Sequence, residues 1–265
     1  MSTQRPAVQD VPRGVRRALA LLVLRLILVL LTTLVAWGIV SAAGGGSAFP
    51  PNPLFASLSL IPVNVICLLV ALRLLRSDGQ RLRDLFGYTP GSWRRDTAWG
   101  LLWVMVLFVP FAGAIMGTAW LLHGERVFVA FETMFYNPDA MIDAPPVLLL
   151  TLGIVAFVTF APLNAPTEEI VFRGYAQSRL TAAWPTAVAI LLTSVAFGLQ
   201  HALFAPTTDA MIVYVAAFTF WGLGSAVIVL WQRRLLPITI AHFVVNLFTS
   251  SPALVFPILL MAGVI

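Results

Sequence analysis

The sequence predicts an all-α protein that crosses a membrane about eight times. Of its 265 residues 60% are hydrophobic and only 10% are charged. The mean hydropathy of +0.93 is far above what a soluble domain of this length needs to fill one core. Several apolar stretches reach the length of about 20 residues that spans about 30 Å of hydrocarbon. We therefore expect a polytopic helical bundle, folded as a single transmembrane domain over residues 1–265.

Eight apolar stretches are candidate membrane-spanning helices. The first is too long to be the hydrophobic part of a signal peptide, and further spans follow it. Pro62 lies inside the second stretch, where it predicts a kink, and Pro110 lies inside the third. The fourth has a polar part, Pro166 to Leu180, that either continues the helix or forms a separate re-entrant helix. The stretches cover about residues 18–43, 54–75, 97–122, 146–180, 185–204, 210–231, 236–250 and 252–265.

The basic residues predict the orientation in the membrane. All sixteen are arginines, which with the abundant Ala, Leu and Val indicates a genome rich in G and C, hence a bacterium. They gather in short segments outside the apolar stretches, and the segment before the first stretch holds Arg5. Short segments rich in arginine normally lie on the cytoplasmic side of the membrane. We therefore expect a plasma-membrane protein with both termini inside, a polar cavity opening toward the cytoplasm, and no bound nucleic acid. The acidic stretch 123–145 would face outward, with RVFVAFETMF along the interface.

Two adjacent carboxylates lie at the edge of hydrocarbon in APTEEIVFRGYAQSRL. Ionisable groups cost about 2.5–3.5 kcal/mol each at a helix centre, so they need partners or a wet cavity. Glu169 and Arg173 are four residues apart, and on one helix face they suit an ion pair. Glu168 points about 100° away, which leaves it more free for chemistry. The alternative is a helix N-terminus capped by Thr167, where acidic residues favour the macrodipole.

Two histidines and an asparagine lie in other apolar stretches. His201 ends the run TSVAFGLQHALF, while His242 and Asn246, in ITIAHFVVNLF, share one helix face because they are four apart. Taken alone, His201 fits a core histidine whose hydrogen bonds are satisfied. His242 and Asn246 alone fit a hydrogen bond between helices. A turn near residues 184–185, however, would put Glu168 and His201 at one depth of a helical hairpin.

A carboxylate, two histidines and a carboxamide in an apolar cavity suit activation of a water for amide hydrolysis. Glu168 would act as general base. His201 and His242 would either bind a divalent metal with Glu168, a ligand set that suits zinc, or donate to the oxyanion of the tetrahedral intermediate. Asn246 would donate to that oxyanion or orient a ligand. The sequence has neither the H-E-x-x-H motif of soluble zinc proteases nor a G-x-S-x-G nucleophile elbow.

These residues resemble the CPBP family of intramembrane endopeptidases, which includes the type II CAAX prenyl endopeptidases and the bacterial Abi-type proteins. The family motifs are Glu-Glu-x-x-x-Arg, Phe-x-x-x-His and His-x-x-x-Asn/Asp. They match, in that order, Glu168 to Arg173, Phe197 to His201 and His242 to Asn246. The resemblance implies a catalytic core at about residues 146–250 and accessory helices within 18–122.

The resemblance also implies roles for single residues. Glu168 would be the catalytic carboxylate, with Glu169 and Arg173 as its support. His201, His242 and Asn246 would complete a group that binds water or a metal, either zinc or another divalent ion. The substrates would be membrane-associated proteins or peptides, and prenylated ones do not fit a bacterial host.

Two other functions stay open. One is a non-proteolytic membrane scaffold, such as a bacteriocin-immunity protein, but such a protein is expected to lose a motif residue and none is missing. The other is an ion- or proton-coupled transporter. A transporter is expected to have broken helices placed symmetrically in two halves, and the sequence has no such symmetry.

Overall fold

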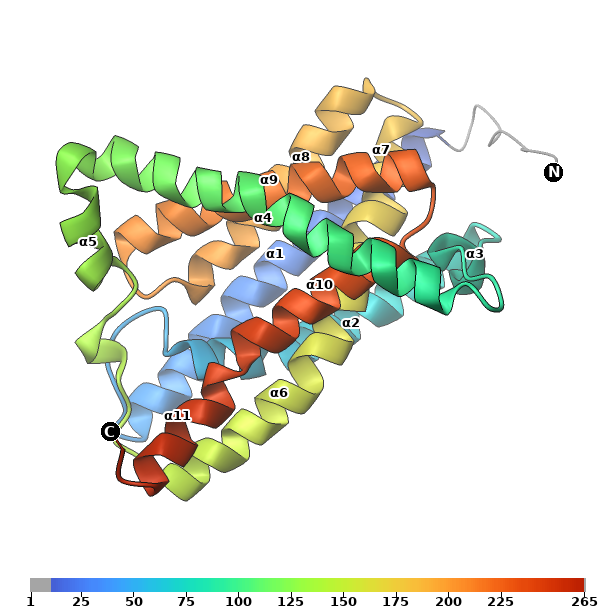
Figure 1. Cartoon of the computed structure of the whole chain (residues 1–265). Helices are drawn as coiled ribbons and strands as arrows, with labels where there is room; N and C mark the ends of the chain where they lie inside the picture. The colour runs from blue at the N-terminus through green and yellow to red at the C-terminus, as the bar shows by residue number, and fades with distance from the viewer. Residues whose placement is uncertain (1–10, 265) are drawn as a thin grey trace.

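The computed structural model describes residues 11–264, and all its regular secondary structure is helical (Figure 1). This confirms the all-α polytopic class. By length and composition seven helical segments of the described chain can cross a membrane, one fewer than predicted. The difference lies at α10 (Leu236–Ser250) and α11 (Pro252–Met261), which together make one span. Ser251 between them keeps helical backbone angles (φ −59°, ψ −34°), so the chain does not turn back at Pro252.

The number of spans bears on where the chain ends lie. The start of α1 (Val11–Ala42) and the end of α11 lie at opposite ends of the bundle in Figure 1. Seven crossings put the two ends of a chain on opposite sides of a membrane, so two cytoplasmic termini do not follow from this fold. Arg5, used in the orientation argument, and Ile265 lie outside the described residues.

The spans pack in two groups around the segment Glu169–Gln177. On one side α1 packs on α2, α2 on α6, and α6 on α10 and α11; on the other α8 packs on α9, and α4 on α9 and α10. Short helices α3, α5 and α7 join or extend them. The remaining bounds are α2 (Pro53–Ser77), α3 (Leu82–Phe86), α4 (Trp93–His123), α5 (Val127–Met134), α6 (Pro146–Glu168), α7 (Ser178–Thr181), α8 (Thr186–His201) and α9 (Thr208–Gln232).

Polarity is distributed as expected of a membrane protein. Large apolar side chains such as Met105, Val109 and Leu121 are more than two thirds exposed on the outside. Charged side chains such as Arg25 and Glu169 are fully buried. Lipid tails solvate the outer apolar groups, whereas ionisable groups face the bundle interior where they find partners.

The fourth span settles the question of the 166–180 segment. It is continuous from Pro146 to Thr181, and Thr167 lies inside α6, so the interpretation of Thr167 as a helix cap is wrong. Residues Glu169–Gln177 form a π-helix whose side chains are all buried. Pro166, shortly before this π-helix, has no backbone N–H and so cannot donate an α-helical hydrogen bond. Short π-helical segments are frequent at functional sites. The π-helix Glu169–Gln177 lies at the centre of the bundle.

A tight turn follows this segment, as predicted. α7 ends at Thr181 and α8 begins at Thr186, so Trp184 and Pro185 lie in the turn of a helical hairpin. Elsewhere the stretch RVFVAFETMF contains α5, which bends away from the axis of α4 in Figure 1.

Candidate active site

Segments from four parts of the chain meet around Glu168 and Glu169. The two glutamates lie where α6 passes into the π-helix. α1 supplies Arg25, α8 supplies Gln200, and α10 supplies His242. All five side chains are buried, so the charges have only one another and the surrounding polar groups as partners.

Glu169 is held by two of the residues that the sequence singled out. His242 Nδ1 lies 2.8 Å from Glu169 Oε1, and Arg173 Nη1 donates to the same oxygen at 3.3 Å. The ion pair predicted from the four-residue spacing is therefore present. Because a carboxylate accepts, Nδ1 carries the proton of the His242 ring in this bond, and Nε2 is left for other chemistry.

Glu168 is less free than its position suggested. Its Oε1 accepts from Arg25 Nη2 at 2.6 Å and from Gln200 Nε2 at 2.9 Å. Its Oε2 has no hydrogen bond within the described part of the chain and lies 3.4 Å from His242 Nε2. One carboxylate oxygen is thus fixed, and the other faces the imidazole.

Arg25 was not predicted from the sequence, and neither were its other partners in this cluster. Its guanidinium also donates to Gln200 Oε1 at 2.7 Å, Asn64 Oδ1 at 3.1 Å and Asn164 Oδ1 at 3.3 Å. An arginine inside the first apolar stretch is itself a signal, since it is costly in hydrocarbon without a partner. The helices interpreted as accessory therefore contribute to the site, through Arg25 of α1 and Asn64 of α2.

His201 lies beside this cluster without bonding to it. Gln200, its neighbour in α8, reaches Glu168, which supports the prediction that Glu168 and His201 share one depth. The His201 ring stacks on Phe218 at 3.6 Å between centroids, and Nδ1 lies 2.7 Å from the Phe197 carbonyl oxygen. A carbonyl only accepts, so Nδ1 carries the proton and Nε2 of the neutral ring is an acceptor.

Phe197 explains the Phe-x-x-x-His pattern. Its carbonyl orients His201, and its ring centroid lies 4.7 Å from the His201 ring and 5.9 Å from the His242 ring. The Arg173 guanidinium lies 4.2 Å from the same ring, within cation–π range. The buried Phe197 ring thus packs against both histidine rings and the Arg173 guanidinium.

Asn246 lies one helical turn beyond His242 and is buried. Its side-chain Nδ2 has no hydrogen-bond partner among the described residues. A buried amide without a partner is costly, so this donor is available to a group that enters the site.

Comparison with protein-family models gives a match to part of the chain. Residues 148–248 match the family model described as Rce1-like, type II CAAX prenyl endopeptidase Rce1-like. The chain carries an Rce1-like domain. This confirms the resemblance to the CPBP family, whose members are intramembrane endopeptidases. No curated protein and no solved structure matches the chain.

The Rce1-like match covers the three motifs but not Arg25 or Asn64. The matched segment therefore holds both glutamates and the histidines, while the preceding helices supply the counter-charge of Glu168. The site is complete only when both parts of the chain are folded together.

The residues of the Rce1-like domain do not fit a metal ion as they are arranged. Within residues 11–264 no group of three or more His, Cys, Asp or Glu side chains is placed to hold one. Glu168 Oε1 already faces the cation of Arg25, and His201 makes no contact with Glu168 at hydrogen-bond distance. The predicted ligand set Glu168, His201 and His242 is thus not assembled. Metal content stays a prediction, which elemental analysis of the purified protein tests.

Proposed function

We propose that the chain hydrolyses peptide bonds of membrane-associated proteins or peptides, with a water activated between Glu168 and His242. One observation carries the proposal. His242 bridges the two glutamates, at 2.8 Å from Glu169 Oε1 and 3.4 Å from Glu168 Oε2, inside a buried cluster of an Rce1-like domain.

Glu168 Oε2 is the proposed general base. It takes a proton from water while the water oxygen attacks the carbonyl carbon of the substrate, and the C–N bond breaks as that proton passes to the leaving nitrogen. Arg25 and Gln200 hold Oε1, so Oε2 stays turned toward His242. Arg25 also supplies the opposite charge that a buried carboxylate requires.

His242 is the proposed partner of this base. Its Nδ1–H is held by Glu169, which Arg173 holds in turn, so the imidazole has one orientation and one tautomer in its neutral form. The logic is that of a carboxylate orienting a catalytic histidine. The Nε2 atom, 3.4 Å from Glu168 Oε2, then relays the proton that Glu168 takes from the water.

Asn246 and His201 have different proposed roles. The free Nδ2–H donor of Asn246 suits stabilisation of the oxyanion that forms on the substrate carbonyl. His201 Nε2, an acceptor in the neutral ring, suits a hydrogen bond from the attacking water. These roles replace the expectation that both histidines donate to the oxyanion.

The test is membrane proteomics of cells that carry Glu168→Gln or His201→Ala in place of the wild-type chain. Glu168→Gln keeps the size of the side chain and a hydrogen bond from Arg25 but removes the base. We expect cleavage products of membrane proteins that both variants abolish. The matched control is Glu132→Gln, the same chemical change on exposed α5, which should leave every product in place. Products that persist in Glu168→Gln would instead favour the non-proteolytic scaffold.

A further inference from the structure

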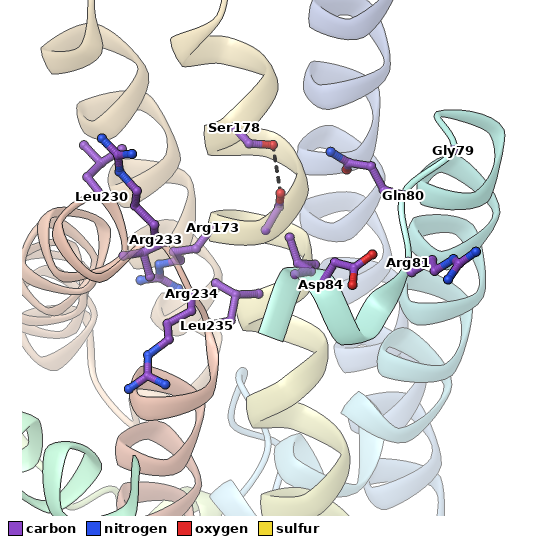
Figure 2. Close-up of a pocket in the computed structure, with 13 residues that line it drawn as sticks. Gly79, Gln80, Arg81, Asp84, Arg173, Ser178, Leu230, Arg233, Arg234 and Leu235 are labelled. Carbon is purple, nitrogen blue, oxygen red and sulfur yellow. Dashed lines mark hydrogen bonds between the residues drawn. The ribbon is translucent and has the colours of Figure 1, made fainter. Parts of the chain in front are cut away.

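A pocket of about 570 Å³ lies at the end of the bundle (Figure 2). Figure 2 shows Gln80, Arg81 and Asp84 on one side of it and Arg173, Arg233 and Leu235 on the other. Its walls come from the chain around α3, the π-helix and the turn between α9 and α10. Arg173, which holds Glu169, is the one residue with a proposed catalytic role among those that line this pocket.

The pocket is positively charged. Four arginines line it, against the single carboxylate of Asp84. Asp84 lies nearest to Arg83 at 3.5 Å, and Arg234 pairs with Asp96 at 2.6 Å. Across residues 11–264, Arg81 and Arg233 make no ion pair. The excess charge is therefore available to an anion.

Arg173 gives the pocket a buried donor. Its side chain is 2% exposed, and Nη1 is engaged by Glu169, but Nη2 has no partner within the described chain. A buried guanidinium N–H without an acceptor costs free energy, and an anionic oxygen of a phosphate or carboxylate is a strong acceptor for it. Arg173 thus adds a buried positive charge and an unpaired donor to the wall of the pocket.

The surroundings fit a lipid headgroup. The pocket lies where several spans end, at Ser77, Thr181 and Gln232, which is the level of the headgroups in a bilayer. Its apolar wall includes Val229 and Leu230, and Leu230 is 40% exposed on the outer surface. Arginine pockets beside such apolar walls between spans suit anionic lipids.

We propose that this pocket binds the phosphate of an anionic phospholipid, with Arg173 and Arg233 on the phosphate and Leu230 along the acyl chains. Binding does not depend on the proposed function. Any effect of lipid binding on cleavage does rest on the proposed function, because Arg173 would then contact both the lipid phosphate and Glu169.

Native mass spectrometry of the full chain, released from micelles that contain phosphatidylglycerol and phosphatidylcholine, tests the binding. We expect the wild type to retain phosphatidylglycerol preferentially. Arg233→Gln should lower that retention about fivefold, the effect of one arginine at a membrane surface. Arg233 has a left-handed backbone (φ 55°), and glutamine adds no strain that arginine lacks. The matched control is Arg94→Gln, an exposed arginine at the same end that does not line the pocket; it should retain the lipid like the wild type.

Three outcomes would overturn the proposal. The first is equal lipid retention in Arg233→Gln and Arg94→Gln. The second is full displacement of phosphatidylglycerol by an equal concentration of inorganic phosphate, which would indicate a site for free anions. The third is unchanged lipid retention in Arg233→Gln together with weaker cleavage of peptides that have a free C-terminal carboxylate, which would indicate a peptide site. Because retention is measured without catalysis, an inactive protein that still retains the lipid would count against the proposed function only.

Discussion

Arg25 Nη2 donates to Glu168 Oε1 across 2.6 Å, although 143 positions separate the two residues in the chain. Both side chains are almost fully buried. The first span, which lies outside the Rce1-like match, thus supplies the charge that balances the proposed catalytic carboxylate.

The first prediction concerns this ion pair. Arg25→Gln should lower the free energy of unfolding by about 3–5 kcal/mol, because it leaves the Glu168 charge buried without its partner. The double variant Arg25→Gln/Glu168→Gln should recover part of that loss, since it removes both charges. Thermal unfolding in detergent measures both variants. A double variant less stable than Arg25→Gln would show that the pair is not the source of the effect.

The second prediction concerns the two nitrogens of His242. In His242→Asn the amide nitrogen takes the place of Nδ1 and can still donate to Glu169, but nothing replaces Nε2. Cleavage should therefore fall by about 10²–10⁴-fold while the unfolding temperature changes little. His123→Asn, at a histidine that contacts Asp209 at 3.0 Å, is the control and should remain active. Full activity in His242→Asn would rule out a role for Nε2.

The third prediction concerns Asn246. Asn246→Leu has a similar volume and removes the free Nδ2 donor. If that donor stabilises the oxyanion, kcat should fall about 10²–10³-fold with little change in KM. Stability should hold, because the Nδ2 donor makes no hydrogen bond within the described residues. A rise in KM at constant kcat would indicate substrate binding instead.

The fourth prediction concerns the packing that holds α8. A Cβ atom at Gly198 would collide with the Val215 carbonyl oxygen and with Thr219 of α9. Gly198→Ala should push α8 away, shift Gln200 and His201, and cost about 1–3 kcal/mol. Gly113→Ala is the matched control, since nothing lies within 4 Å of a Cβ there. Equal unfolding temperatures for the two variants would contradict this.

The fifth prediction concerns topology. Cys67 is the single cysteine and is buried, so introduced cysteines can be labelled selectively. With seven spans, Val264→Cys should react with a membrane-impermeant maleimide on intact cells. Arg81→Cys should react only after the cells are opened. Labelling of both positions only in opened cells would restore the expectation of two cytoplasmic termini.

The membrane class and the polar residues of the site were readable from the sequence, because each follows from local composition. A charge in an apolar stretch is costly wherever the stretch packs, so Glu168, Glu169 and His242 stand out without a structure. The Glu169–Arg173 pair was predictable too, since both members lie on one helical segment.

Features that depend on contacts between parts of the folded chain could not be predicted from the sequence. Hydropathy cannot show that the chain continues as a helix through Ser251, so the sequence predicts one span more than the seven candidate segments of the described chain. The π-helix at Glu169–Gln177, which is buried along its whole length, was not predicted either.

The sequence by itself therefore determined that this chain is a helical membrane protein and which polar side chains have to be accommodated within it. Only the tertiary structure decided how those side chains pair. Arg25 could satisfy any buried carboxylate within reach, and the choice of Glu168 depends on how α1 and α2 pack against the π-helix. The packing of whole helices sets such distances, and no local pattern encodes them.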